Sequence, residues 1–307
     1  MQTVNKSHAL EADAFRDIPY TPSGNPDTDR FHLFDLYVPK SPSGHSGTPG
    51  NDATRKPPLI CFVHGGAWRS EDKADHEDLA RHLVASTAFP VAIPNYRLTK
   101  PETPYKHPAH AQDTLAFLEF VLGWSGPGGT PPYDPTRLFL IGHSCSAHML
   151  TSIFLSPPPH NPPHDPPHPD PLTPSDKLLK APQGIILSEG IYDIDLLLES
   201  FPAYKDWFIA NTFGDLPSYA AFDTTTYRLR KPDEQNHIAW FVIHSKGDQL
   251  VDVLQSQNFY QHVGELTGGD RLRWDESLNS GHNDTLKEDA YVKMVAKFVK
   301  DVLNGDV

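Results

Sequence analysis

The chain has 307 residues, and its 26 lysines and arginines against 39 aspartates and glutamates give a formal net charge of −13. This acidic balance argues against nucleic acid as a partner, because binding to phosphates needs clustered basic side chains. Hydrophobic residues make up 38% of the sequence, which is enough for a core and too much for a generally disordered chain.

Two features of the sequence bear on where the protein works. Only two cysteines are present, Cys61 and Cys145, which is typical of a reducing compartment and not of a disulfide scaffold. The first residues lack the apolar segment of a signal peptide, and no apolar run has the length of a membrane helix. We therefore expect a cytoplasmic protein without a membrane partner; the oligomeric state stays open.

Proline and histidine are unusually frequent, at 31 and 17 residues. Much of the proline lies in a Pro/His-rich segment at about 156–176, which also holds His160, His164 and His168. Proline at this density prevents helices and central strands, so we expect an extended surface insert. The prolines also exclude the helix on which these evenly spaced histidines could bind a metal.

The remaining segments alternate between strand and helix patterns. Strands are expected at 31–38, 59–64, 91–96, 137–144, 184–190, 237–245 and 271–277. Helices are expected at 73–86, 107–123, 145–155, 252–266 and 284–303, with short helices in 193–213. Such alternation predicts a mostly parallel sheet with helices on both faces. The length alone would allow two domains, but this pattern favours one α/β domain over residues 1–307.

The sharpest chemical motif is GHSCS at 142–146, which lies between an apolar strand and a helix. This is the context of a nucleophile elbow, in which a tight turn lifts a serine hydroxyl above the sheet. Ser144 is then the nucleophile, and Ser146 stands where the G-x-S-x-G pattern has its last glycine. A turn with an ordinary helix-capping serine is the alternative.

A second motif, HGGAW at 64–68, also follows an apolar strand. Adjacent glycines allow backbone N–H groups to point into a cleft, where they can hold an oxyanion. The expected donors are Gly65, Gly66 and Ala67, together with the N–H of Cys145. A phosphate-binding turn is disfavoured because neither G-x-G-x-x-G nor a P-loop lysine accompanies the motif.

Two further motifs follow late strands: HSKGD at 244–248 and GHND at 281–284. His282 is the expected general base, and Asp248 would orient its imidazole, with Asp252 as the alternative acid. The carboxyl ends of parallel strands meet at one edge of a sheet, where open α/β folds place their sites. A Ser–His–Asp mechanism of this kind requires neither a metal nor a cofactor.

These motifs resemble those of the α/β-hydrolase superfamily, in its HGG-type esterase/lipase branch. HGGAWRSEDK at 64–73, GHSCSAH at 142–148 and EGIYDI at 189–194 are most similar to the eukaryotic kynurenine formamidase (arylformamidase) family. The resemblance implies an eight-stranded α/β-hydrolase fold and a serine hydrolase with a Ser144–Asp248–His282 triad. The sequence departs from the family pattern at Ala67, where an aromatic residue is usual, and at Ser146.

The substrate pocket is expected to be formed by residues beside these motifs, with His64, Trp68, His143 and Tyr192 as candidates. Residues at about 193–235 are expected to form a small cap. Six aromatic residues would give this cap an apolar face: Tyr192, Phe201, Tyr204, Trp207, Phe208 and Phe213. An apolar cap favours aryl or acyl substrates.

Three functions follow from these observations. The first is hydrolysis of an aryl formamide such as N-formyl-kynurenine through an acyl-enzyme. The second is a carboxylesterase, lactonase or secondary-metabolite hydrolase on the same triad, which the departures at Ala67 and Ser146 favour. The third is a non-catalytic protein on a hydrolase fold, which the complete set of Ser144, Asp248 and His282 disfavours.

Overall fold

The computed structural model describes residues 11–22, 30–40, 55–158 and 172–307. The centre of the Pro/His-rich insert, residues 159–171, lies outside them, so the expectation for this segment is not addressed. Within the described residues, eight strands form one sheet in the order β1-β2-β4-β3-β5-β7-β9-β10. Their bounds are β1 Ala12–Pro19, β2 Leu33–Pro39, β3 Leu59–Val63, β4 Val91–Pro94, β5 Leu138–His143, β7 Pro182–Ser188, β9 Ala239–Ile243 and β10 Leu272–Asp275.

The sheet is parallel from β4 to β10, and only β1 and β2 run antiparallel to their neighbours. This arrangement, with the helices described below, confirms the predicted mostly parallel α/β-hydrolase fold. Val63 lies opposite Gly142, and Gly142 lies opposite Leu187. The loops that follow these strands therefore leave the sheet at the same edge.

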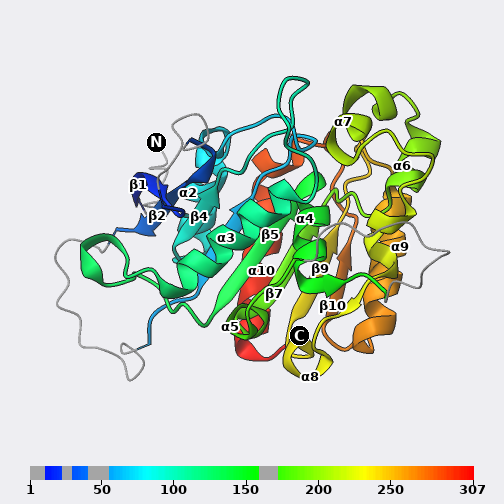
Figure 1. Cartoon of the computed structure of the whole chain (residues 1–307). Coiled ribbons are helices and arrows are strands. Elements are labelled where there is room, and N and C mark those ends of the chain that lie inside the picture. The colour runs from blue at the N-terminus through cyan, green and yellow to red at the C-terminus, as the bar shows by residue number, and fades with distance from the viewer. Residues whose placement is uncertain (1–10, 23–29, 41–54, 159–171) are drawn as a thin grey trace, which may run out of the picture.

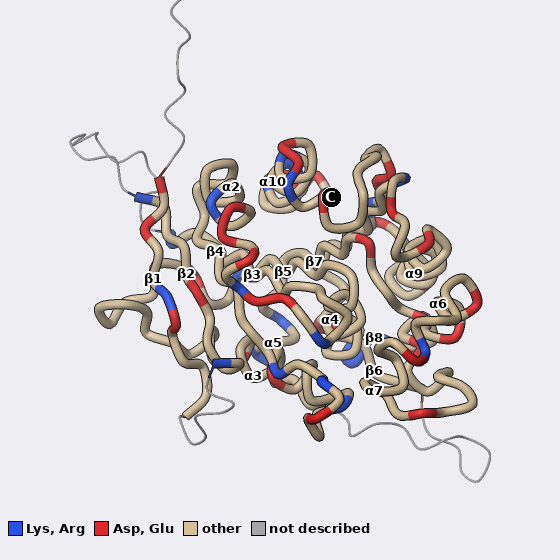
Figure 2. The backbone as a smooth tube through the Cα atoms, turned by 90° about the horizontal axis from the view of Figure 1, so that it is seen from above, with Lys and Arg blue, Asp and Glu red and all other residues tan. Residues whose placement is uncertain are grey.

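Helices cover both faces of the sheet (Figure 1). In the view from above, α2 and α10 lie on one face of the sheet, and α3 and α5 lie on the other face (Figure 2). The larger helices are α2 Glu77–Thr87, α3 Ala109–Gly123, α4 Cys145–Phe154, α9 Val253–Thr267 and α10 Asp289–Asn304.

Strand residues supply the core alternately to the two faces, as a period of two requires. In β3, Leu59, Cys61 and Val63 pack with the α3 and α4 side, whereas Ile60 and Phe62 pack with α2 and α10. All five residues are completely buried. A continuous apolar run is therefore what this central strand needs, because both of its faces are covered.

The region expected to form a cap folds into short elements beside the sheet. They are α6 Ile194–Ser200, a π-helical turn η4 at Lys205–Ile209, α7 Ala210–Phe213, the 3-10 turns η5 Ala220–Phe222 and η6 Thr224–Thr226, the strand β8 Arg228–Leu229 and α8 Pro232–Gln235. β8 pairs with the short strand β6, Leu155–Ser156, in a separate two-stranded ribbon. α6 and α7 lie together near one end of the molecule (Figure 1).

Several shorter elements complete the fold, and two of them lie within the helices predicted at 73–86 and 284–303. The remaining ones are η1 Arg30–His32, η2 Lys73–His76, η3 Pro127–Gly129, α5 Asp176–Lys180 and η7 Thr285–Lys287. The strand β1 was not predicted, because its sequence ADAFRDIP is half exposed and carries charges at an edge of the sheet. It pairs with β2 and completes the eight strands.

Candidate active site

Ser144 lies in the sharp turn between β5 and α4, as the elbow prediction requires. Its φ of 58° and ψ of −124° are a conformation that a serine rarely adopts. The Ser144 N–H donates to the carbonyl of Ser188 at 3.0 Å, and the Ser144 carbonyl accepts from the N–H of Ala147 at 3.1 Å. These bonds hold the strained turn in place, and the side chain reaches the cavity described below.

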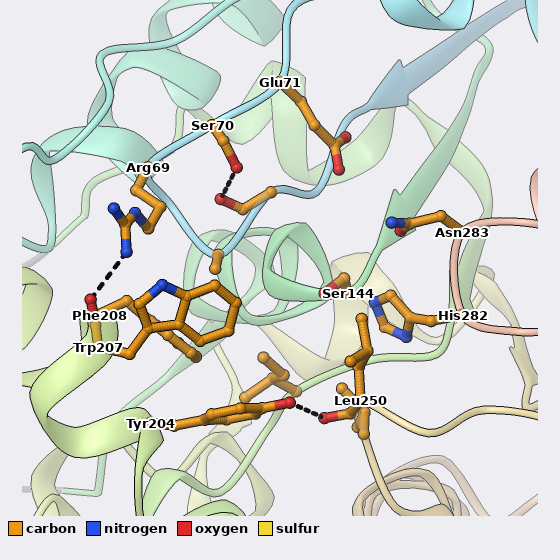
Figure 3. A pocket seen from close by; sticks show the side chains of 14 residues that line it. Arg69, Ser70, Glu71, Ser144, Tyr204, Trp207, Phe208, Leu250, His282 and Asn283 are labelled. Atoms are coloured by element: carbon orange, nitrogen blue, oxygen red, sulfur yellow. Dashed lines mark hydrogen bonds between the residues drawn. The ribbon is translucent and has the colours of Figure 1, made fainter.

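His282 is brought to Ser144 from the loop after β10. The imidazole ring extends toward the Ser144 side chain (Figure 3). Its Nδ1 lies 2.7 Å from Oδ2 of Asp248. Nδ1–H donates to this carboxylate, which leaves Nε2 as the nitrogen free to act on a hydroxyl.

Asp248, and not Asp252, is the acid that reaches His282. Burial acts to raise the pKa of Asp248, but the hydrogen bond and charge of His282 lower it below the usual value, so the group is ionised. Its Oδ1 also accepts the N–H groups of Leu250 and Val251 at 2.8 and 3.1 Å. Asp252 instead caps α9 by accepting the N–H of Leu254.

The loop after β3 carries the expected oxyanion donors. Gly66 has a φ of 91°, and a side chain there would collide with the backbone of Ser70, so glycine is required. Ala67 follows with a φ of 53°. Gly66 and Ala67 both line the cavity beside Ser144. Gly65, the third expected donor of this loop, is not among the lining residues, and a Cβ added to it would come within 3.1 Å of His143 and Ser144.

Cys145 is the first residue of α4, a position whose N–H has no partner within a helix. Its thiol turns away from the cavity and accepts the N–H of Trp68 at 3.2 Å. Burial raises the pKa of the Cys145 thiol to about 12, so it is uncharged. The side chain is a packing group, and the backbone N–H is the feature of Cys145 that matters for an oxyanion.

A cavity of about 360 Å³ opens above Ser144 (Figure 3). Its wall consists of the loops after β3, β9 and β10 and of an aromatic side formed by Tyr204 and η4. The lining residues are Gly66, Ala67, Arg69, Ser70, Glu71, Ser144, Ile191, Tyr204, Trp207, Phe208, Leu250, Val251, His282 and Asn283. Arg69 donates to the carbonyl of Trp207 at 2.9 Å, and the Tyr204 hydroxyl donates to the carbonyl of Leu250 at 3.1 Å. These bonds tie the aromatic side to the loop after β3 and to the loop after β9.

The four residues predicted to line the pocket do not line it. His64, Trp68, His143 and Tyr192 are completely buried behind its wall. The Trp68 ring packs edge-on against Phe213, and Tyr192 stacks on Phe259 with ring centroids 4.1 Å apart. Their side chains point from the motifs back into the core, which motif spacing does not reveal.

His143 contributes to the site indirectly. Its Nε2–H donates to the carbonyl of His282 at 3.1 Å, so it holds the backbone of the histidine loop. Burial lowers the pKa of His143 to about 3, which keeps it neutral. The side chain of Glu189 accepts the N–H of Ser245 through Oε1 at 3.0 Å, and its Oε2 lies 3.9 Å from His143 Nε2.

Sequence reasoning missed several cavity residues. Three of them, Arg69, Ser70 and Glu71, directly follow HGGAW, and Asn283 follows His282. Their place in the motif loops was the available signal. Of the six aromatic residues expected in the cap, Tyr204, Trp207 and Phe208 face the cavity.

Comparison with known proteins agrees with this geometry. The BD-FAE family model matches residues 48–155. The structure superposes on a truncated carbohydrate esterase from gut microbiota with a TM-score of 0.66 at 15% identity, over 97% of this chain and 99% of the other. Carboxyl esterase 2 of the fungus Tuber melanosporum gives a TM-score of 0.62 at 17% identity, over 98% and 89%. These solved structures show that the chain has the α/β-hydrolase fold.

The relatives found by sequence similarity point to a narrower class of hydrolase. A kynurenine formamidase of Meyerozyma guilliermondii is 27% identical over 64% of this chain and 68% of its own length. A kynurenine formamidase-like hydrolase of Fusarium equiseti is 24% identical over 88% and 89%. The chain is thus an α/β-hydrolase similar to the kynurenine formamidases, which confirms the resemblance found in its motifs.

None of the helices in the described ranges is both long and apolar enough to cross a membrane.

Proposed function

We propose that Ser144, His282 and Asp248 form the catalytic triad of this hydrolase. The observation that carries the proposal is the 2.7 Å bond between Asp248 and the Nδ1 of an imidazole that extends toward a strained serine at an elbow. Asp248 holds the ring in the tautomer whose Nε2 can accept a proton, and it stabilises the imidazolium that forms.

The reaction then has two steps. His282 takes the proton of Ser144 as the hydroxyl oxygen attacks the carbonyl carbon, and it returns that proton to the leaving group. Water, activated in the same way, hydrolyses the acyl-enzyme. With a formamide substrate, the intermediate is a formyl ester of Ser144 and the leaving group is an amine.

The oxyanion is held by backbone N–H groups of Gly66, Ala67 and Cys145. Positive φ angles at Gly66 and Ala67 turn the loop toward the cavity, and the third donor lies at the start of α4. Loss of one such donor typically costs about 3 kcal/mol in the transition state.

For the substrate, we propose an aryl formamide, with N-formyl-kynurenine as the first compound to test. The kynurenine formamidase relatives support this class. The cavity also suits an aromatic ring, because Tyr204, Trp207 and Phe208 form one of its sides.

The test is a comparison of kcat/KM for N-formyl-kynurenine with kcat/KM for p-nitrophenyl esters of increasing acyl length. The proposal expects the formamide to be the better substrate. Turnover of esters with no detectable formamide hydrolysis at high enzyme concentration would contradict it. Ser144→Ala serves as the control for background hydrolysis.

A carboxylesterase is the second candidate, and Ala67 favours it. Ala67 lines the cavity where the family pattern has an aromatic residue, so the space next to the oxyanion differs from that of the relatives. The change at Ser146 does not bear on the substrate, because its hydroxyl donates to the carbonyl of Val63 at 2.7 Å behind the elbow.

Residues 193–235 act as a cap, since η4 from this region closes one side of the cavity. A small-molecule substrate is in keeping with the size of the cavity, about 360 Å³. A cytoplasmic location is in keeping with the two buried, unpaired cysteines.

A further inference from the structure

Three side chains with metal-binding atoms meet at the edge of the catalytic cavity. One potential ligand atom each from His64, Glu71 and His76 lies within 4.8 Å of the other two. His64 follows β3, Glu71 belongs to the same loop with a φ of 72°, and His76 ends η2. Figure 3 shows the Glu71 carboxylate above the cavity, apart from Ser144 and His282.

The hydrogen bonds of His64 leave one nitrogen unoccupied. Its Nδ1 lies 3.1 Å from the carbonyl of Gly65, and a carbonyl can only accept, so Nδ1 carries the proton. In the neutral ring Nε2 then has a free lone pair. This atom has no hydrogen-bond partner although the residue is completely buried. A buried, bare acceptor beside two further ligand groups indicates a missing partner.

The other two groups are already close together. His76 Nε2 lies 2.9 Å from Glu71 Oε2. The rings of His64 and His76 are nearly parallel, at 11°, with centroids 5.9 Å apart. Two imidazoles and one carboxylate are a ligand set that suits Zn²⁺, with bonds of about 2.0–2.2 Å. Ligand atoms around such an ion lie about 3.4 Å apart, so side-chain shifts of about 1 Å would complete the site.

A second cavity, of about 480 Å³, gives access to this cluster. Glu71 and His76 line it together with Asp75 and Asp78. Its three carboxylates outnumber the one lysine of the lining, Lys287, and favour the entry of a cation. Because Glu71 lines both cavities, an ion bound there would lie beside the catalytic cavity without contacting the proposed triad.

We propose that His64, Glu71 and His76 form a binding site for a divalent transition-metal ion of the zinc type, separate from the hydrolytic machinery. The fourth position is open to water from the second cavity. His64 and Glu71 flank residues 65–70, the loop that carries two of the proposed oxyanion donors. A bound ion would join the two ends of this loop and stabilise the folded chain.

The experiment measures Zn²⁺ binding to metal-stripped full-length protein by isothermal titration calorimetry. The background carries His160→Ala, His164→Ala and His168→Ala, so that the Pro/His-rich insert contributes no binding. We expect one ion per chain and a raised melting temperature. His76→Ala and Glu71→Gln should each weaken Kd at least tenfold, since even outer-shell partners of ligands are worth about 10–100-fold.

His82→Ala is the matched control, because His82 lines the same cavity outside the cluster. It should bind Zn²⁺ as the background protein does. Bound Co²⁺ should show visible d–d absorption that is lost in His76→Ala. Circular dichroism confirms that each variant is folded. Absence of stoichiometric binding, or equal affinity in His76→Ala and His82→Ala, would overturn the proposal.

Discussion

At the scale of single residues, the site depends on conformations that would be unfavourable elsewhere. Ser144 and Ala67 both have positive φ values, of 58° and 53°, which cost a non-glycine residue roughly 1–3 kcal/mol. The surrounding hydrogen bonds and packing hold these conformations. These backbone conformations bring the Ser144 hydroxyl and the Ala67 backbone to the same cavity.

Substitutions of Asp248 and Asp252 test which of the two aspartates is the acid of the proposed triad. Asp248→Asn should lower kcat by about 10⁴-fold, because the amide favours the wrong tautomer of His282. Asp252→Asn should change kcat less than tenfold, since Asp252 caps α9 and asparagine is also a good cap. Steady-state kinetics of the two variants decides the assignment, and a large loss in Asp252→Asn alone would refute it.

Glu189 gives the protein a distinctive dependence on pH. Burial and the charge of Asp248 raise the pKa of Glu189 to about 8. Folding raises the pKa of this carboxyl group from about 4.5 to about 8. Its contribution to stability is therefore complete below the unfolded pKa and is lost as the pH rises to about 8. Its slope is about 1 kcal/mol per pH unit.

Glu189→Gln should therefore lose less stability than wild type between pH 5 and pH 8. Its amide oxygen can still accept the N–H of Ser245. Urea unfolding across this range measures the difference. Parallel curves for the two proteins would show that Glu189 is ionised in the folded state throughout.

At the scale of elements, the β3 loop and α4 are joined by the hydroxyl of Ser146. Its single O–H is shared between the carbonyls of Val63 and His143, at 2.7 and 2.9 Å, and its oxygen accepts the N–H of His143 at 2.7 Å. The residue that departs from G-x-S-x-G thus links the end of β3 to the elbow. Ala67, in contrast, faces the cavity.

These positions separate stability from specificity. Ser146→Ala should reduce stability by about 1–3 kcal/mol, because buried groups lose their partner, and leave the ratio of formamide to ester kcat/KM unchanged.

Ala67→Tyr should shift the ratio of formamide to ester kcat/KM by an order of magnitude or more toward the formamide, because it restores an aromatic residue at the cavity. Denaturant curves and the two substrate assays test both. A shifted ratio in Ser146→Ala would contradict the assignment.

Elements with a strong pattern were predictable from the sequence, and side-chain directions were not. Buried runs such as Leu59–Val63 indicate central strands, but β1 is an exposed edge strand whose pattern resembles a loop. The motifs located Ser144, Asp248 and His282. They could not show that Trp68 and Tyr192 turn into the core, because that direction depends on partners such as Phe213 and Phe259.

At the scale of the whole molecule, the histidine excess has a consequence for stability. Burial lowers the pKa of His110 and His143 to about 3, and that of His148 to about 4. Each is neutral in the folded chain and takes up a proton near pH 6.5 when unfolded. Their contribution is complete above pH 6.5 and is lost as pH falls, by about 1 kcal/mol per pH unit for each histidine.

We therefore expect the free energy of unfolding to fall steeply between pH 6.5 and pH 5, before most carboxylates titrate. In His148→Gln, whose amide can still donate to the carbonyl of Phe222, the fall should be smaller. Urea unfolding at several pH values measures both slopes. Equal slopes in wild type and variant would show that His148 is not buried in its neutral form.

The most direct test of the account is covalent labelling of the nucleophile. Folded wild-type protein is treated with a fluorophosphonate probe, followed by intact-mass measurement and peptide mapping. We predict one adduct, on Ser144, which is absent in Ser144→Ala and forms far more slowly in His282→Ala. A wild-type protein that stays unlabelled, or an equal adduct in Ser144→Ala, would contradict the assignment of Ser144 as the nucleophile.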